Sequence, residues 1–293
     1  DALNDAGGVP SPANGISLGI SLSGTNLFQS GIGTEAYAIS AAGDGAEGLN
    51  SYNEDTPFGD FRTQTVDALL AAEGTHPLRR EYRRRLRGAL DAEIEFTAAM
   101  QNAVPLTASF EAGPFGQALR QIARVISVRD VLGATRQTFF VTVGGWDHHD
   151  EVLNNQAAML PAISRGLSDF RDALVELGVY DQVTTFTMSD FGRTLTSNGR
   201  GSDHGWGGHH VVMGGAVNAG PVIGRYPDIT ATNPLDVGRG IYAPTTAVDP
   251  YFAELALWFG VPPSSLPDVL PNIGRFYDPA SGSAPLGFLA GAV

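Results

Sequence analysis

The pattern of apolar and polar residues changes twice along the chain. The first stretch, residues 1–57, is rich in Gly, Ser, Asn and Ala, and within it residues 16–22 alternate apolar and small polar side chains as a half-buried strand does. From residue 58 to 135 the spacing is helical and predicts helices over residues 61–104 and 115–132. We therefore expect loops and short strands first and a helical insertion next.

The third stretch, residues 136–293, has the pattern of strands alternating with helices. Residues 137–143 (QTFFVTV) and 182–188 (QVTTFTM) are β-rich runs, and residues 155–177 between them have apolar side chains at helical spacing. This order predicts a βαβ unit in a parallel sheet. Each strand leads into a polar cluster, and open α/β sheets bind ligands outside the carboxyl ends of their strands.

Two further elements are predicted nearer the C-terminus. Residues 211–217 are a candidate short strand, and residues 246–259 have the pattern of a helix. Thr246 is its predicted N-cap, Asp249 lies in its acidic first turn, and Gly260 is its stop signal.

Five of the six histidines fall between His148 and His210, each beside a carboxylate or another histidine. The clusters read GGWDHHDE at residues 144–151, SDFGRT at 189–194 and DHGWGGHH at 203–210. Asp and neutral His are ligands that zinc, manganese or iron take in an open, catalytic kind of site. The clusters therefore predict the wall of a metal centre.

In the first two clusters, three residues are candidates for this centre. Asp147 and His149 are one residue apart, so an extended backbone directs both to the same side and His148 elsewhere. Asp147 in a turn or capping role is the alternative. Asp190 follows a predicted strand, where it would bind the metal, act in catalysis or merely cap the turn.

The third cluster adds further candidates. Asp203 and His204 are either two neighbouring ligands or a histidine oriented by its own carboxylate. His209 and His210 face opposite sides in a strand, so one of them joins the same ion, and we favour His210. Arg193 has two open interpretations: its guanidinium binds an oxyanion such as phosphate or sulfate, or it pairs with a nearby aspartate.

Composition excludes several classes of protein. The formal net charge is −13 and the pI is about 4.7, which argues against nucleic acid as the main partner. The chain has no cysteine, so disulfides and thiolate ligands are excluded, and all 18 basic residues are arginine, which excludes lysine Schiff-base chemistry. No run approaches the roughly 20 apolar residues of a membrane-spanning helix.

Arginines concentrate in one part of the helical stretch, after a predicted break at residues 74–77. Six lie within residues 79–87 and are followed by Asp91, Glu93 and Glu95. This pattern favours a solvated helix face with i,i+4 ion pairs over an anion-binding patch.

The ordered motifs Gly-Gly-Trp-Asp-x-His, Ser-Asp-Phe-Gly-Arg-Thr, Asp-His-Gly-Trp-Gly-x-His-His and Gly238-Arg239-Gly240 resemble a bacterial family, domain-of-unknown-function family fifteen-oh-one, from about Gly15 to Phe276. The family is usually exported with a twin-arginine signal and is commonly grouped with the alkaline phosphatase and sulfatase superfamily. The resemblance implies an α/β/α sandwich with a mostly parallel sheet and a site for a divalent metal ion: zinc, manganese or iron, with calcium as a further candidate. The implied ligands are Asp147, His149, Asp190, Asp203, His204 and His210.

The resemblance also sets expectations about partners and place. Family members carry an early strand and a Gly-Gly-x-Asp-Gly-Leu-Asn motif ahead of the part that this chain matches, and the superfamily's nucleophile lies in that region. We therefore assign no nucleophile, and expect either a homo-oligomer or a partner segment to complete the sheet. The expected place is secreted, periplasmic or at the bacterial cell surface.

Two functions follow from different classes. The first is a metal-dependent hydrolase of phosphate or sulfate esters, acting on a small anionic ester or on a sulfated or phosphorylated polymer, with Asp190 and Arg193 as its catalytic residues. The second is a non-catalytic extracellular or cell-surface protein, binding or structural, that retains the fold.

Overall fold

The computed structural model describes two compact units, each with its own core, and together they make a mixed α/β protein. The first comprises residues 16–106 and 112–142, and the second residues 107–111 and 143–292. The described residues are 16–31, 33–72, 74, 76–218, 220, 222–230 and 232–292. Among them, no helix is both long and apolar enough to cross a membrane.

A small parallel sheet lies in the first unit. Its strands are β1 (Gly19–Ser21), β2 (Tyr37–Ala38) and β3 (Thr138–Phe140), in the order β2-β1-β3. Both pairings are parallel, with Ile20 opposite Tyr37 on one side and Phe139 on the other. Ile20 is fully buried because it stands on the central strand. The predicted strands at residues 16–22 and 137–143 are thus confirmed.

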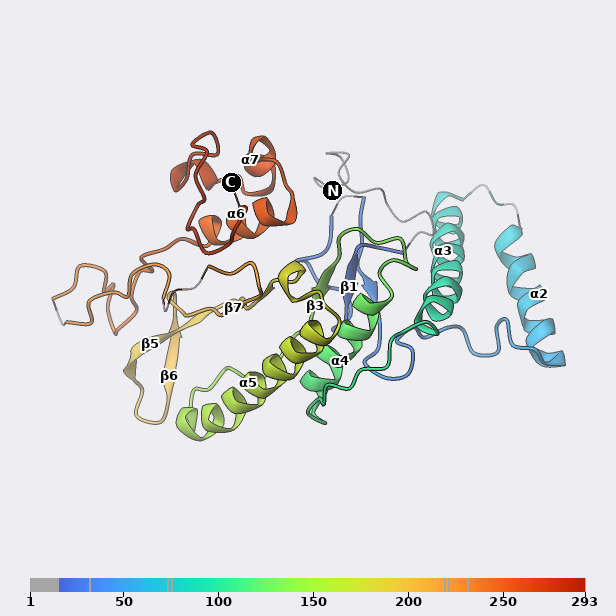
Figure 1. Ribbon diagram of the computed structural model, residues 1–293, viewed down its shortest axis with the longest axis horizontal. Helices are drawn as coiled ribbons and strands as arrows, with labels where there is room; N and C mark the ends of the chain where they lie inside the picture. The colour runs from blue at the N-terminus through green and yellow to red at the C-terminus, as the bar shows by residue number, and fades with distance from the viewer. Residues whose placement is uncertain are drawn as a thin grey trace. The chain divides into compact units, whose positions relative to one another are not determined.

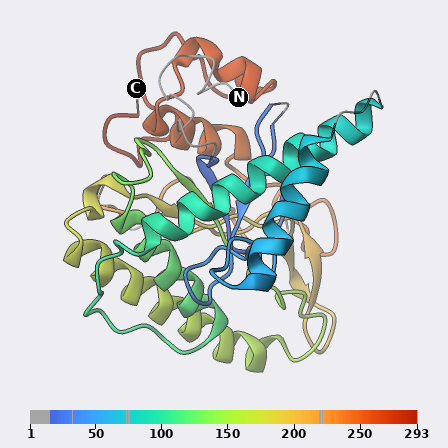
Figure 2. The ribbon, with the colours of Figure 1, turned by 90° about the vertical axis from the view of Figure 1, so that its right-hand side faces the viewer.

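Three helices accompany this sheet: α2 (Pro57–Ala71), α3 (Pro77–Met100) and α4 (Pro114–Ser127). Each has a proline in its first turn, where the missing N–H costs no hydrogen bond. The helices α2 and α3 lie side by side (Figures 1 and 2), and the predicted break falls between them. Phe96 and Met100, near the end of α3, are buried in a cluster with Ile20.

The second unit contains α5 (Val152–Glu176), a β-hairpin and a C-terminal helical layer (Figure 1). The remaining elements are β4 (Thr185–Phe186), β5 (Gly192–Ser197), β6 (Ser202–Gly205), β7 (Val212–Met213), α6 (Val248–Phe259), α7 (Leu266–Val269) and the 3-10 turns η1 (Tyr180–Gln182), η2 (Pro263–Ser265) and η3 (Ile273–Arg275). The pairs β5–β6 and β4–β7 are antiparallel.

The strands do not connect as the sequence pattern predicts. We expected residues 137–143 and 182–188 to belong to one parallel sheet, but β3 pairs with β1, whereas β4 pairs antiparallel with β7. The apolar pattern indicates that a run is extended, yet it does not specify which strand accepts its hydrogen bonds. Among the described residues the parallel sheet has three strands.

The prediction for the C-terminal helix is confirmed at one end and wrong at the other. Gly260 closes α6 with a left-handed φ of 107°, as its stop signal indicates. At the start, Ala247 and not Thr246 is the N-cap, and no side chain caps the helix there. Asp249 lies in the first turn, where a carboxylate favours the positive end of the helix dipole.

A buried carboxylate holds the C-terminal segment to α6. The side chain of Glu254 is fully buried. Its Oε2 accepts hydrogen bonds from the backbone N–H groups of Leu286 and Gly287, and its Oε1 accepts one from Leu289, each at 2.6 Å. Phe288, between these donors, is packed in the apolar cluster of this unit. A buried charge is tolerated here because three donors replace its water.

We expect Glu254→Gln to destabilise the second unit. The amide offers one oxygen in place of two, so at least one buried N–H faces another N–H, and an unsatisfied buried donor costs about 1–3 kcal/mol. Urea unfolding followed by tryptophan fluorescence measures the loss. Asp268→Asn, at an exposed carboxylate in the same unit, is the matched control. Equal unfolding midpoints for the two variants would mean that the hydrogen bonds of Glu254 do not stabilise the unit.

Candidate metal centre

The loop before α5 is held by the β5–β6 hairpin. Asn198, in the turn of the hairpin, donates from Nδ2 to the carbonyl of His149 at 2.9 Å. Gly201 packs directly on the same loop, since a Cβ there would lie 2.7 Å from the carbonyl oxygen of His148. The close approach therefore requires glycine at position 201. These contacts bring the first and third histidine clusters together.

The carboxylate of Asp147 is the centre of the cluster. Its Oδ1 lies 2.7 Å from Nε2 of His204 and 3.1 Å from Nε2 of His149. Arg193 donates from Nη2 to the same oxygen at 3.0 Å. One potential ligand atom from each of Asp147, His149 and His204 lies within 4.8 Å of the others. Three of the predicted ligands thus meet at one point, and Arg193 pairs there with an aspartate, which is the second of its two interpretations.

Asp203 lies on the other side of His149. Its Oδ1 is 3.4 Å from Nδ1 of His149 and accepts a hydrogen bond from Asn198 at 3.3 Å, while Arg239 pairs with Oδ2. Nδ1 of His149 therefore has a carboxylate beside it, as the outer ring nitrogen of a metal-bound histidine usually does. Asp203 therefore orients His149, and not its sequence neighbour His204 as one interpretation of the sequence had it.

Phe191 fixes the ring of His204. The two rings stack with centroids 4.2 Å apart and an interplanar angle of 1°. The guanidinium of Arg193 lies 5.1 Å from the Phe191 ring centroid, close enough for a cation–π contact. The side chain of Arg193 also donates to the carbonyl oxygens of Trp146 and Ser202, both at 2.8 Å. Its position is therefore set by four contacts.

Sequence reasoning gave no role to Phe191, Asn198 or Arg239. Phe191 and Arg239 do lie in two of the motifs that carry the family resemblance, Ser-Asp-Phe-Gly-Arg-Thr and Gly238-Arg239-Gly240, so a signal was present. Asn198 lies in the hairpin turn and has no such signal. Its role follows from the fold of the hairpin alone.

Besides Asp203, two predicted ligands lie outside the group formed by Asp147, His149 and His204. The carboxylate of Asp190 is exposed, and no hydrogen bond or ion pair joins it to another residue in the described part of the chain. The ring of His210 stacks on Tyr251 with centroids 5.9 Å apart, and its Nδ1 is 3.5 Å from Thr187 Oγ1. Adjacency in sequence to a cluster did not bring these side chains to its centre.

The electrostatics of the cluster favour ionised carboxylates. The hydrogen bond with His204 lowers the pKa of Asp147, and the charges of His149 and Arg193 act in the same direction. Hydrogen bonds from Asn198 and then Arg239 lower the pKa of Asp203. By contrast, desolvation of its ring, followed by the charge of His209, lowers the pKa of His210, which favours the neutral imidazole.

The donor set fits a divalent metal ion. Two imidazole nitrogens and a carboxylate are the three protein ligands of one class of catalytic zinc site. The side chains of Asp147, His149 and His204 are each about half exposed (58%, 50% and 49%), so a fourth position open to water or substrate is compatible with the arrangement. The carboxylate behind His149 supplies the outer hydrogen bond that metal-bound histidines usually make.

The fold and the site together define a mixed α/β protein. Its Asp–His cluster lies on a loop and on a neighbouring hairpin. The chain belongs to the family described as protein of unknown function (DUF1501), whose model matches residues 25–243. The match covers more than half of the chain and includes every residue of the cluster. No characterised protein and no solved structure matched the chain in the same comparisons.

We expect His204→Gln to raise the pKa of Asp147 in the metal-free protein. The folded-state pKa of this carboxyl lies below its unfolded value, so its contribution to stability is complete above the ordinary Asp value of about 3.9 and is lost as pH falls through the folded-state value. Removing the His204 hydrogen bond moves the folded value back towards the ordinary one. The carbon-13 resonance of the carboxyl group, followed against pH, reports this shift.

The control for this titration is His76→Gln, at the N-cap histidine of α3 in the other unit. It leaves the pKa of Asp147 unchanged if the effect belongs to the cluster. An unchanged value in His204→Gln as well would mean that the 2.7 Å contact is not formed in solution.

Proposed function

We propose that the protein is a metal-dependent hydrolase of phosphate or sulfate esters. The observation that supports this most directly is the convergence of Asp147, His149 and His204, with Arg193 against the same carboxylate oxygen. Ligands for a cation and a donor for an anion therefore lie side by side. A phosphate or sulfate ester bound to a metal needs both.

Zinc, manganese or iron is the proposed ion, with calcium as a further candidate. Imidazole nitrogens favour the first three, since calcium prefers an all-oxygen shell. When bound, such an ion polarises the ester and lowers the pKa of a bound water towards neutrality. Arg193 would hold the anionic group by two parallel hydrogen bonds, and Asp203 would keep His149 in the ligating tautomer.

The observed position of Asp190 removes one of its two predicted roles, that of metal ligand, and leaves the catalytic role. Because its carboxylate lies outside the cluster, we no longer propose it as a metal ligand. Its exposure, one residue from Phe191, leaves it free to meet substrate, and we retain it as a candidate catalytic residue on that ground. His210 is likewise set aside as a ligand, since its ring stacks on Tyr251 away from the three donors.

The finer family expectations belong to the same proposal. We propose an alkaline phosphatase or sulfatase type of α/β/α sandwich, and secretion to the periplasm or cell surface, on the strength of the family resemblance. A second copy of the chain or a partner segment would add strands to the sheet, whose edge strands β2 and β3 have two and three residues. An open sheet edge carries unpaired N–H and C=O groups, with which a further strand would pair.

A second candidate is a non-catalytic extracellular or cell-surface protein, binding or structural. One observation favours it: the donor atoms are already paired with one another, through Asp147, His149, His204 and Arg193. The charged groups of such a cluster have partners without an ion. Metal binding therefore separates the two candidates more sharply than any structural comparison does.

We expect the purified protein to bind zinc or manganese stoichiometrically and to hydrolyse an aryl phosphate or aryl sulfate. The double variant Asp147→Asn with His204→Gln removes two of three ligands and should abolish both. Elemental analysis and calorimetric titration measure the binding, and release of the aryl alcohol measures the reaction. His76→Gln is the control. Hydrolysis that persists in the double variant and in the presence of chelator refutes the proposal.

We expect Asp203→Asn to weaken metal binding without abolishing it, by about 10–100-fold, as loss of an outer hydrogen-bond partner typically does. Asp190→Asn, outside the cluster, should leave metal affinity unchanged. Calorimetric titration of both variants with zinc compares them directly. A larger loss in Asp190→Asn than in Asp203→Asn would show that the structure assigns their roles wrongly.

A further inference from the structure

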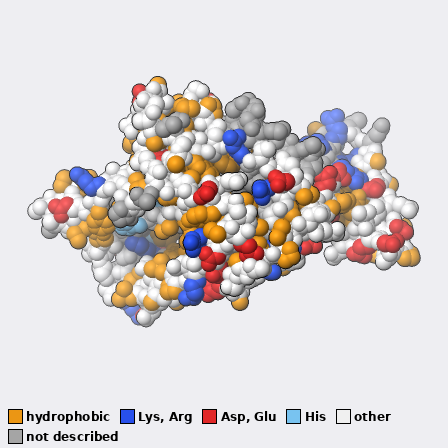
Figure 3. Space-filling view, in the orientation of Figure 1, with side chains coloured by type: hydrophobic (Ala, Val, Ile, Leu, Met, Phe, Trp, Pro, Cys, Tyr) orange, Lys and Arg blue, Asp and Glu red, His pale blue; other side chains and the backbone are white. Residues whose placement is uncertain are grey.

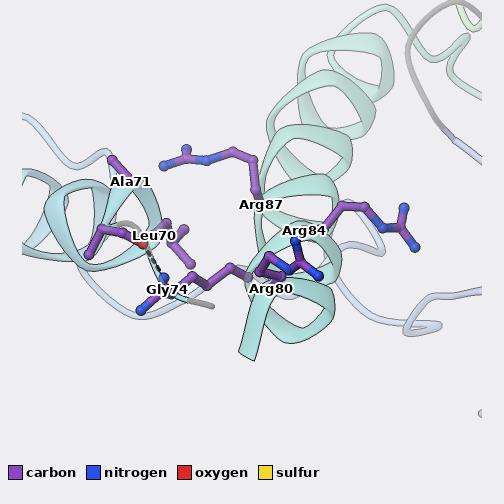
Figure 4. Close-up of a pocket in the computed structure, with 8 residues that line it drawn as sticks. Leu70, Ala71, Gly74, Arg80, Arg84 and Arg87 are labelled. Atoms are coloured by element: carbon purple, nitrogen blue, oxygen red, sulfur yellow. Dashed lines mark hydrogen bonds between the residues drawn. The ribbon is translucent and has the colours of Figure 1, made fainter. Parts of the chain in front are cut away.

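One face of α3 carries four arginines where a packed helix usually carries apolar residues. Arg80, Arg83, Arg84 and Arg87 follow the spacing i, i+3, i+4 and i+7, which places them on one side of the helix. Together with the C-terminal end of α2 they line a pocket of about 650 Å³ (Figure 4). The α2 side of this pocket consists of Leu70, Ala71, Ala72 and Gly74.

The four guanidinium groups differ in their partners. Arg84 pairs with Glu81 at 2.6 Å, and Arg87 pairs with Asp67 at 2.5 Å. The side chain of Arg83 donates to the backbone carbonyl of Ala72 at the end of α2. Arg80 makes no side-chain hydrogen bond or ion pair with another described residue.

Among the described residues, no carboxylate forms an ion pair with Arg80 or Arg83 of this pocket. Glu81 is moreover shared, because Arg85 binds the same Oε1 at 2.8 Å. Like charges at i,i+4 destabilise a helix by about 0.2–0.5 kcal/mol per pair, and a bound anion would relieve this repulsion. The sequence pattern favoured a solvated face with ion pairs, and Arg84 and Arg87 do form such pairs. The positive charges of Arg80 and Arg83 remain without a carboxylate partner among the described residues.

The location of this positive charge is unusual for the chain as a whole. Six of the 18 basic residues lie within residues 79–87 of a protein with a net charge of −13. In the space-filling view, Arg side chains gather over the N-terminal end of α3, whereas acidic ones gather over the N-terminal end of α2 (Figure 3). Arg87 extends from α3 towards α2 across the pocket (Figure 4).

We propose that this arginine pocket is an anion-binding site, distinct from the candidate metal centre, for a ligand with two or more phosphate or sulfate groups. One group would bind Arg80 and Arg83, which have no carboxylate partner among the described residues, and another would compete for Arg87. The guanidinium group matches such anions by paired hydrogen bonds. The apolar wall from α2 has room for the scaffold that joins the groups.

The test measures binding of inorganic tripolyphosphate and of a fully sulfated disaccharide by calorimetry at low salt. The two probes distinguish phosphate from sulfate as the natural group. A hydrogen bond to a charged group contributes enough that Arg80→Gln should weaken binding about ten-fold or more. Arg79→Gln removes the same charge from the neighbouring position, which does not line the pocket, and should change affinity little.

Two results would overturn the proposal. Equal losses in Arg80→Gln and Arg79→Gln would mean that the probes respond to general positive charge and not to a built site. Absence of binding by both probes at low salt would leave only a solvated helix face. The double variant Asp147→Asn with His204→Gln should bind tripolyphosphate as the unaltered protein does, so this test is separate from that of the hydrolase.

Discussion

The oxygen Oδ1 of Asp147 is the atom on which the candidate centre depends. Side chains from the loop and from both strands of the hairpin reach it: His149, Arg193 and His204. None of these segments is long, and the pair β5–β6 contains a register shift between Arg193 and Ser197. A single charged atom with three partners therefore orders a part of the chain that has little regular structure of its own.

A second carboxylate with several partners lies at the C-terminal end of the same unit. Glu254 binds three backbone N–H groups of a segment without helix or strand, much as Asp147 gathers side chains. The environments differ: Glu254 is fully buried, so its hydrogen bonds are charge-assisted in a medium of low dielectric, whereas Asp147 is more than half exposed and screened by water. The first contact holds the fold, and the second is free to exchange partners.

The sequence predicted local structure better than connectivity. The helices, the break before Pro77 and the cap at Gly260 follow from spacing and from proline and glycine signals, which act within a few residues. Strand pairing depends on distant partners, so the pattern at residues 182–188 could not show that β4 joins β7. For the centre, Asp147, His149 and His204 were recognised by residue type, but Asn198 is placed by a turn that no motif marks.

The charges around the cluster bear on how metal and anion binding would be linked. Asp147 and Asp203 are balanced by Arg193 and Arg239, so with neutral imidazoles these groups have no net charge. Under the proposed function, a divalent ion would compete with Arg193 for Asp147 and would add two positive charges. Arg193 would remain in place because Trp146 and Ser202 hold it by their carbonyl oxygens. The same ion would thereby free one N–H of this guanidinium and add the positive charge that attracts an ester anion.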